Sequence, residues 1–213
     1  MDGDSSRNVC QGPIRGHATE ARWIADASRD IWRTADASHP RRGELERFIA
    51  ARYQQAYAAT LSEFMPMLVA LSDGSGQIVA AAGFRCAAQG PLFLEQYLDQ
   101  PLEALLSAAY DAVVPRSALV EIGHLSGMGY GGGRALFPRI ARHLQHAGLD
   151  WAAFVATRSL RGLFARMGVA PRSLAAARAE RLGLRARDWG RYYDTDPWVV
   201  GGPLSLGAGW LQP

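Results

Sequence analysis

Apolar residues recur along this chain at helical spacing in some segments and as short uninterrupted runs in others. Spacings of three and four residues predict helices, whereas short apolar runs bounded by turn residues predict strands. On this pattern we expect helices over 18–39, 44–59, 101–113, 134–148, 158–168 and 174–183. Strands are expected over 67–71, 78–84, 117–125, 150–157 and 198–200, and segment 91–99 fits a strand or a short helix.

Turn residues indicate how several of these elements connect. The Ser-Asp-Gly-Ser-Gly sequence between the first two strands is typical of a hairpin loop. Pro101 suits the first turn of a helix, and Gly148 and Gly168 suit helix ends. Antiparallel neighbours followed by a strand–helix–strand crossover predict a mixed sheet in a layered α/β or α+β fold.

Five glycines within seven residues, over 127–133, separate the strand 117–125 from the next helix. A strand that runs through glycines into a helix N-terminus presents unpaired backbone N–H groups to an anion, and pyrophosphate is the usual occupant. A flexible glycine-rich linker is the alternative. Pro138 lies inside the expected helix, so we expect the regular helix to start late, near Leu136.

Composition and charge exclude several classes of protein. No run of 18 apolar residues occurs and no secretory signal is visible, so we expect a cytoplasmic protein without a transmembrane segment. All 23 basic residues are scattered arginines and the net charge is +3, which argues against nucleic acid as a partner. The absence of lysine excludes a P-loop and Schiff-base chemistry.

Metal binding is also not expected from this sequence. The two cysteines make neither a disulfide framework nor a metal-binding spacing. His143 and His146 lie three residues apart on a predicted helix, which is more typical of a solvated face than of a metal site.

The order of elements around the glycine segment resembles the GNAT fold of N-acetyltransferases. In that fold the loop after the fourth strand binds the pyrophosphate of coenzyme A through a Gln/Arg-x-x-Gly-x-Gly/Ala pattern. Gly131, Gly132 and Gly133 match its glycines, but Met128 stands in place of the Gln or Arg. The resemblance implies that the acyl donor contacts Leu125, Ser126, Gly129, Gly131, Gly132, Gly133 and Arg134.

A closer resemblance covers about residues 40–202. Segments such as "ERFIAARYQQAY", "VEIGHLS" and "WGRYYDTDPWVVGG" resemble the family catalogued as thermostable hemolysin, whose members are similar to acyl-homoserine-lactone synthases. It implies one GNAT-like acyltransferase domain over 18–213, with a C-terminal extension over 172–213. Residues 1–17 are expected to form a flexible tail.

Glu121 interrupts an otherwise apolar strand, where an ionised carboxylate is costly without a partner. It is either a general base with a raised pKa or the partner of an arginine such as Arg85. Strand alternation places Glu121 and His124 on opposite faces, so both reach one cleft only if a bulge redirects the strand. His124, where the family more often has asparagine, is either a catalytic or substrate-orienting residue or a satisfied polar residue at a strand end.

Arg85 closes an apolar strand and Glu95 interrupts the apolar segment 91–99. The homoserine-lactone synthases carry an arginine and a glutamate at positions that Arg85 and Glu121 match. We take Glu121, His124, Arg85 and Glu95 as the candidate catalytic residues. For Arg85 and Glu95 the alternative to a substrate contact is a mutual salt bridge.

Phe164 stands where many GNAT enzymes use tyrosine to protonate the departing thiolate. Tyr192 or Tyr193 could supply that proton instead. A further set of aromatic residues near the C-terminus could line an acyl or acceptor pocket, or pack the tail onto the core: Trp189, Tyr192, Tyr193 and Trp198.

The function implied by the resemblance is acyl transfer from acyl-CoA, or from the phosphopantetheine of an acyl carrier protein, to the amine of a small-molecule acceptor. No tightly bound cofactor is expected, and a homodimer is compatible with the sequence. Two other hypotheses remain open. One is a membrane-active, haemolysin-type protein, and the other is a GNAT-like protein that binds a thioester without catalysis.

Overall fold

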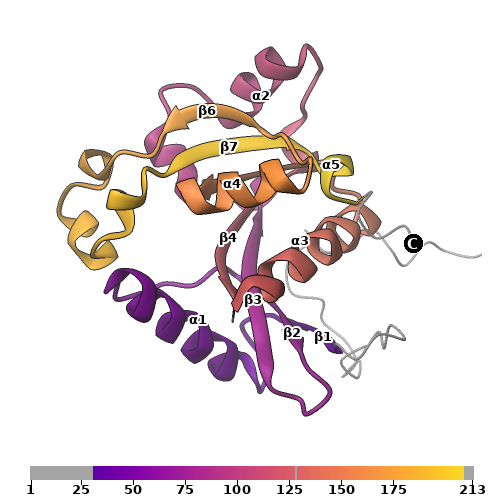
Figure 1. Cartoon of the computed structure of the whole chain (residues 1–213). Coiled ribbons are helices and arrows are strands. Elements are labelled where there is room, and N and C mark those ends of the chain that lie inside the picture. Colours follow the sequence, from indigo (N-terminus) through magenta and orange to yellow (C-terminus); the bar gives the residue numbers. More distant parts are fainter. Residues whose placement is uncertain (1–30, 128, 209–213) are drawn as a thin grey trace, which may run out of the picture.

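The computed structural model describes residues 31–127 and 129–208. Seven strands form one sheet in the order β1-β2-β3-β4-β5-β7-β6, in which only the β4–β5 pair is parallel (Figure 1). The strands are β1 (Ile31–Ala35), β2 (Met67–Ser72), β3 (Ile78–Cys86), β4 (Leu119–Gly127), β5 (Trp151–Ala156), β6 (Arg172–Ala176) and β7 (Trp198–Pro203). This mixed, mostly antiparallel sheet confirms the predicted fold class.

Helices connect these strands. The α-helices are α1 (Arg42–Tyr57), α2 (Leu102–Tyr110), α3 (Gly129–His146), α4 (Arg158–Arg166) and α5 (Ser205–Ala208). The 3₁₀ helices are η1 (Ala87–Gln89), η2 (Phe93–Tyr97), η3 (Arg116–Ala118), η4 (Ala179–Trp189) and η5 (Tyr192–Thr195). The segment 91–99 is therefore a short helix rather than a strand.

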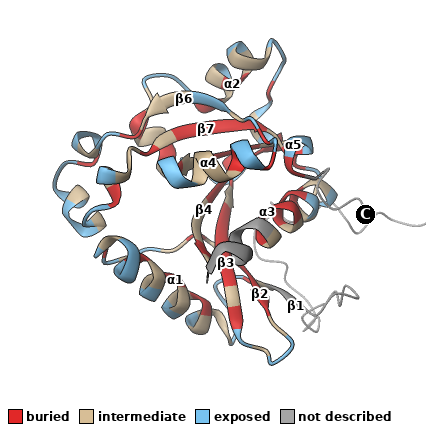
Figure 2. Cartoon of the chain, in the orientation of Figure 1, coloured by how far each residue is buried: buried red, intermediate tan, exposed pale blue. Residues whose placement is uncertain are grey.

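Alternating side chains on each strand divide the core between the two faces of the sheet. Val120 and Ile122 of β4 pack in one cluster with buried residues of α3 and α4. Leu119 packs on the other face with buried residues of η2 and α2, and α1 covers the β2–β3 part of that face. Figure 2 shows the buried residues concentrated on the strands and the inner helix faces. The sheet is thus covered on both sides, as its long apolar strands require.

The predicted helix over 18–39 is wrong at its C-terminal end. Residues 31–35 form β1, which pairs antiparallel with β2 from Ile31 opposite Ser72 to Ala35 opposite Leu68. Backbone pairing along the edge of an existing sheet overrode the helical spacing of the apolar residues. Residues 18–30 and the predicted tail 1–17 lie outside the described residues.

The glycine segment is mostly helical, whereas the sequence predicts a glycine loop or linker before a helix that becomes regular near Leu136. β4 ends at Gly127 and α3 begins at Gly129, so most of these glycines lie in the first turns of the helix. The helix also continues through Pro138, although we expected regular helix only from about Leu136. Proline removes one backbone donor from a helix, and the apolar face that α3 packs against the sheet offsets this loss.

Residues 172–203, which belong to the expected C-terminal extension, contribute two strands to the central sheet. The helix expected over 174–183 is wrong, because β6 includes its first three residues and the 3₁₀ helix η4 begins at Ala179. β7 lies between β5 and β6 and pairs with both. The sheet therefore needs residues 172–203 for its completion.

The sheet is open near its centre, because β4 and β5 separate partway along their length. β4 pairs with β5 only over Leu119–Glu121, opposite Trp151–Ala153, and the rest of β5 pairs with β7 alone. On its other edge β4 loses register with β3 between Gly123 and Ser126, and His124 there has a left-handed φ of 54°. A bulge of this kind bends a strand and redirects its side chains.

No helix among the described residues is long and apolar enough to cross a membrane.

Candidate active site

A cavity of about 650 Å³ passes through the opening between β4 and β5. Its lining includes residues of α4 on one face of the sheet and residues of α1, η2 and η4 on the other. On the α4 side these are Thr157, Ser159, Leu160, Leu163 and Arg166. On the α1 side they include Tyr53, Tyr57, Phe93, Gln96, Tyr97, Arg185, Asp188, Trp189 and Tyr192. The cavity can therefore receive one molecule from each face of the sheet.

Glu121 lies at the point where β4 and β5 diverge and lines this cavity. Only 2% of its surface is exposed. Its two carboxylate oxygens accept hydrogen bonds from the backbone N–H groups of Phe93, at 2.8 Å, and Leu94, at 2.9 Å. Burial raises the pKa of this carboxyl to about 7, although the two N–H donors and the charge of Arg85 act in the opposite direction. A carboxyl with a pKa of about 7 is partly ionised at physiological pH, and its ionised form can accept a proton from a molecule in the cavity.

The bulge brings His124 to the same side of the sheet as Glu121. Its ring lies 6.1 Å from Tyr53 of α1 and 5.5 Å from Phe64, and it lines the cavity. Burial and the charges of Arg42 and Arg85 lower the pKa of His124 to about 4. The neutral ring accepts a hydrogen bond at Nδ1 from the backbone N–H of Met65, at 3.4 Å. Its proton then resides on Nε2, so His124 suits a hydrogen-bond donor better than a base.

Two opposing glycines make room for this arrangement. Gly83 of β3 and Gly123 of β4 are cross-strand partners, and a Cβ atom on either would come within 2.5 Å of Met65. The Met65 side chain consequently packs against both glycines, and its backbone N–H donates to His124.

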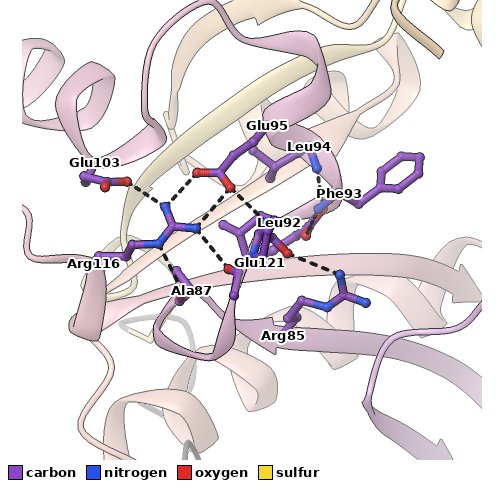
Figure 3. A network of polar contacts seen from close by, with 11 residues as sticks. Arg85, Ala87, Leu92, Phe93, Leu94, Glu95, Glu103, Arg116 and Glu121 are labelled. Atoms are coloured by element: carbon purple, nitrogen blue, oxygen red, sulfur yellow. Dashed lines mark hydrogen bonds and ion pairs between the residues drawn. The ribbon is translucent and has the colours of Figure 1, made fainter.

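The second arginine–glutamate group lies beside Glu121 but is chemically different (Figure 3). Arg116 donates to both carboxylate oxygens of Glu95, at 2.7 and 3.0 Å, and to Glu103 at 2.9 Å. It also donates to the carbonyl oxygens of Ala87 and Gly90. Glu95 additionally accepts from the N–H of Leu92, which caps η2. Glu95 is not among the residues that line the cavity, and its contacts are those of a structural ion pair.

Arg85 does not pair with either glutamate. It lines the cavity, and among the described residues its guanidinium makes one long hydrogen bond, 3.4 Å to the carbonyl oxygen of Pro91. The alternative of a mutual salt bridge between Arg85 and Glu95 is therefore wrong, since Glu95 pairs with Arg116. An ion pair between Arg85 and Glu121 is likewise not formed within the described residues.

The wall of the cavity on the α1 side comes from the segment between β6 and β7, which reaches the end of α1 at the left of Figure 1. The N–H of Arg191 donates to the carbonyl oxygen of Tyr57, and the N–H of Thr60 donates to that of Asp188. Gly190, at φ 52°, permits this approach, because a Cβ atom there would lie 2.3 Å from the carbonyl oxygen of Tyr57. The contact places Trp189 and Tyr192 against Tyr53.

Phe164 does not face the cavity. It is 1% exposed and packs against Phe137 and Phe154, with ring centroids 4.5 and 5.2 Å away. Of the two tyrosines considered in its place, Tyr192 lines the cavity and its hydroxyl donates to the carbonyl oxygen of Val155 on β5, at 3.4 Å. Tyr193 is not in the cavity lining, and its hydroxyl is hydrogen-bonded to that of Tyr97 at 2.7 Å. Burial raises the pKa of both Tyr192 and Tyr193.

Of the residues expected to contact an acyl donor, some line the cavity and others do not. Leu125 lines the cavity, whereas Ser126 is buried and its hydroxyl donates to the carbonyl oxygen of His124. Gly129, Gly131, Gly132, Gly133 and Arg134 fall in the first turns of α3, and their surroundings lie outside the described residues.

Sequence reasoning missed most of the cavity wall. Trp189 and Tyr192 were expected in a pocket and are there, but Trp198 is not. Tyr53 and Tyr57 fall within the helix expected over 44–59, and their four-residue spacing places them together on one side of α1. Phe93, Gln96 and the segment 60–65 gave no signal, because their place in the wall depends on how distant elements dock.

A family model described as thermostable hemolysin matches residues 35–208 of this chain. No curated protein sequence matches the chain significantly. Among solved structures, the chain is similar to FeeM, an N-acyl amino acid synthase from uncultured soil microbes, and to the AHL synthase LasI. FeeM is 14% identical, with 86% of this chain and 99% of FeeM covered and a TM-score of 0.55. LasI is 13% identical, with 82% and 90% covered and a TM-score of 0.54.

A third similar structure is that of a protein from Lactobacillus plantarum named as a candidate N-acetyltransferase. It is 11% identical, with 81% of this chain and 98% of that one covered and a TM-score of 0.50. At such identities the likeness establishes the fold, which is GNAT-like.

Proposed function

This chain belongs to the thermostable hemolysin family, and we propose that it is an N-acyltransferase that moves an acyl group from an acyl thioester to the amine of a small acceptor. The observation that carries the proposal is Glu121, a buried carboxyl with a pKa of about 7 that lines the cavity where the pairing of β4 with β5 ends. The names of FeeM and LasI, an N-acyl amino acid synthase and an AHL synthase, support the same chemistry on the same fold.

We infer that the two substrates bind on opposite faces of the sheet. The opening between β4 and β5 leads toward α4, where Leu160 and Leu163 offer an apolar surface for an acyl chain. The edge of β4 that faces β5 has no strand partner beyond Glu121 in the part of the chain that the structure describes. An extended phosphopantetheine arm, of acyl-CoA or of an acyl carrier protein, can hydrogen-bond along this edge as an added strand would.

The acceptor then enters from the α1 side and meets the thioester at Glu121. The amine nitrogen attacks the thioester carbon, and the proton that it loses passes to the Glu121 carboxylate. Backbone N–H groups on the free edge of β4 stabilise the oxyanion of the tetrahedral intermediate. Collapse of the intermediate breaks the C–S bond, and the leaving thiolate takes up the proton that Glu121 accepted, which restores the carboxylate. The Tyr192 hydroxyl, which also lines the cavity, can relay this proton.

The test is turnover by the purified protein with a series of acyl-CoA thioesters and a mixture of primary amines, including amino acids. Thiol release and the mass of the amide product are both recorded. We expect an N-acyl product, and we expect Glu121→Gln to lower kcat/KM by about 100- to 10,000-fold, the usual contribution of a general base. Thermal unfolding of the variant separates loss of the base from loss of the fold.

Glu95→Gln is a matched control, because it alters a neighbouring carboxylate on η2 that pairs with Arg116 and does not line the cavity. Absence of product from acyl-CoA and from acylated carrier protein alike would contradict the proposal. Equal losses of turnover in the two variants would remove Glu121 from the role of base.

A further inference from the structure

The charged groups on the α1 side of the cavity carry an inference about the acceptor, which rests on the proposed function. Arg85 and Glu121 are directly opposite each other in the β3–β4 ladder, and both line the cavity. Residues paired in this way have Cβ atoms about 5 Å apart on one face of the sheet. Opposite charges at such a position normally form a salt bridge.

Here the two charges are held apart. The carboxylate of Glu121 is drawn toward η2 by the N–H groups of Phe93 and Leu94. The guanidinium of Arg85 reaches only the carbonyl oxygen of Pro91, at 3.4 Å, which uses one of its five donors weakly. A half-buried guanidinium with most of its donors unused, beside a cavity, is a site for an anionic group.

The position of Arg85 indicates which substrate brings that anion. β3 lies on the side of β4 that is away from β5, and Arg85 shares the face of the sheet that carries Glu121, η2 and α1. In the proposed function, the acyl donor enters on the α4 face, through the opening between β4 and β5. Arg85 therefore faces the acceptor and not the phosphates of the donor.

We propose that Arg85 binds a carboxylate of the acceptor while Glu121 receives its neighbouring amine, so that the acceptor is an α-amino acid. The fixed negative and positive charges match the ammonium and carboxylate of a zwitterion, and the α-carbon fits between them. The side chain of this amino acid contacts Phe93 and Trp189, whose rings lie 5.5 Å apart and line the cavity next to Glu121. An apolar or aromatic side chain is therefore preferred.

The experiment compares three acceptors of the same shape: L-phenylalanine, L-phenylalaninamide and phenethylamine. Each is acylated with the best donor by the unaltered protein, by Arg85→Met and by Arg142→Met. Arg142 is an exposed residue of α3 that does not line the cavity, which makes it the matched control. The quantity measured is the ratio of kcat/KM for the acid to kcat/KM for the amide.

We expect Arg85→Met to lower this ratio by about 10- to 100-fold, which is the discrimination that a charge-assisted hydrogen bond provides. Arg142→Met leaves the ratio unchanged. Because the same two amines are compared in every variant, their different basicities cancel. An unaltered ratio in Arg85→Met overturns the proposal, and so does a protein that acylates amides and simple amines but no amino acid.

A binding measurement keeps this proposal separate from the proposed function. If no acceptor is acylated, calorimetric titration with L-phenylalanine and L-phenylalaninamide decides. Binding of the acid that is weakened 10-fold or more in Arg85→Met supports the carboxylate site even where acyl transfer fails. Equal binding of acid and amide by the unaltered protein, or no binding of either, overturns it.

Discussion

Two neighbouring arginine–glutamate groups contact η2, and they differ in whether their charges are paired. Arg116 uses its guanidinium fully on Glu95, Glu103 and two carbonyl oxygens, and this cluster joins η1, η2, α2 and η3. Arg85 and Glu121 are direct neighbours in the sheet, yet each bonds to backbone atoms instead of to the other. The first group is closed and holds the fold together, whereas the second is open and faces a cavity. The comparison indicates that a charged side chain can bind a substrate when the protein itself does not pair it with an opposite charge.

The largest effect expected for the open group of Arg85 and Glu121 is on the pH dependence of turnover, which tests Glu121 as the base. The base must be ionised to accept a proton, so kcat/KM should rise with pH until it levels off above the pKa of Glu121, about 7. At pH 5, two units lower, the rate should be about 100-fold below the plateau. Initial rates between pH 5 and 9, at constant ionic strength, measure this profile.

A carboxyl of ordinary pKa would give a flat profile above pH 5.5, and that result would contradict the role of burial. His124 cannot produce the same rise, because its pKa is lowered to about 4. The profile of His124→Asn should therefore retain its inflection near 7.

A substitution in the closed group of Arg116, Glu95 and Glu103 should lower the stability of the fold without changing the preference between acceptors. Arg116→Met removes both ion pairs and leaves Glu95 and Glu103 partly buried without their partner, so we expect the free energy of unfolding to fall by about 2 kcal/mol. Denaturant unfolding measures this change. The preference for an acid over an amide acceptor should be retained, in contrast to Arg85→Met, and its loss would mean that the two groups act as one.

The smallest expected effect concerns the bulge that brings His124 to the site. At φ 54°, asparagine is tolerated well, so His124→Asn should change the free energy of unfolding by less than about 0.5 kcal/mol. His124→Val should cost about 1 kcal/mol more, because a β-branched residue is strained in the left-handed region. Equal stabilities of the two variants, measured by thermal unfolding, would indicate that the strand has no bulge at this position.

The fold was predictable where local chemistry and tertiary context agree. The hairpin of β2 and β3, the helices α1, α2 and α4, and the strands β4, β5 and β7 follow from periodicity and turn residues. β1 and β6 were predicted as helices, because an edge strand is stabilised by the neighbour that it pairs with and not by its own pattern. The start of α3 was missed because glycine and proline are poor helix formers, and packing on the sheet outweighs that preference.

The candidate site was predictable in its residues but not in their partners. A glutamate in an apolar strand and an arginine at the end of another are visible in the sequence, and both lie in the cavity. Glu95 looks the same in the sequence, since it too interrupts an apolar segment, but it lies in a closed ion pair. Its partner Arg116 is 21 residues away, and no spacing rule connects them.

The sequence by itself determined the family, the layered α/β class and the presence of a costly carboxylate on β4, because these depend on composition and on contacts between near neighbours. The tertiary structure alone decided that β4 and β5 separate after Glu121, that a bulge turns His124 to the same side, and that Arg85 remains unpaired. These features arise from register and docking between distant segments. Their energies depend on which atoms meet, and a linear pattern of residues does not contain that information.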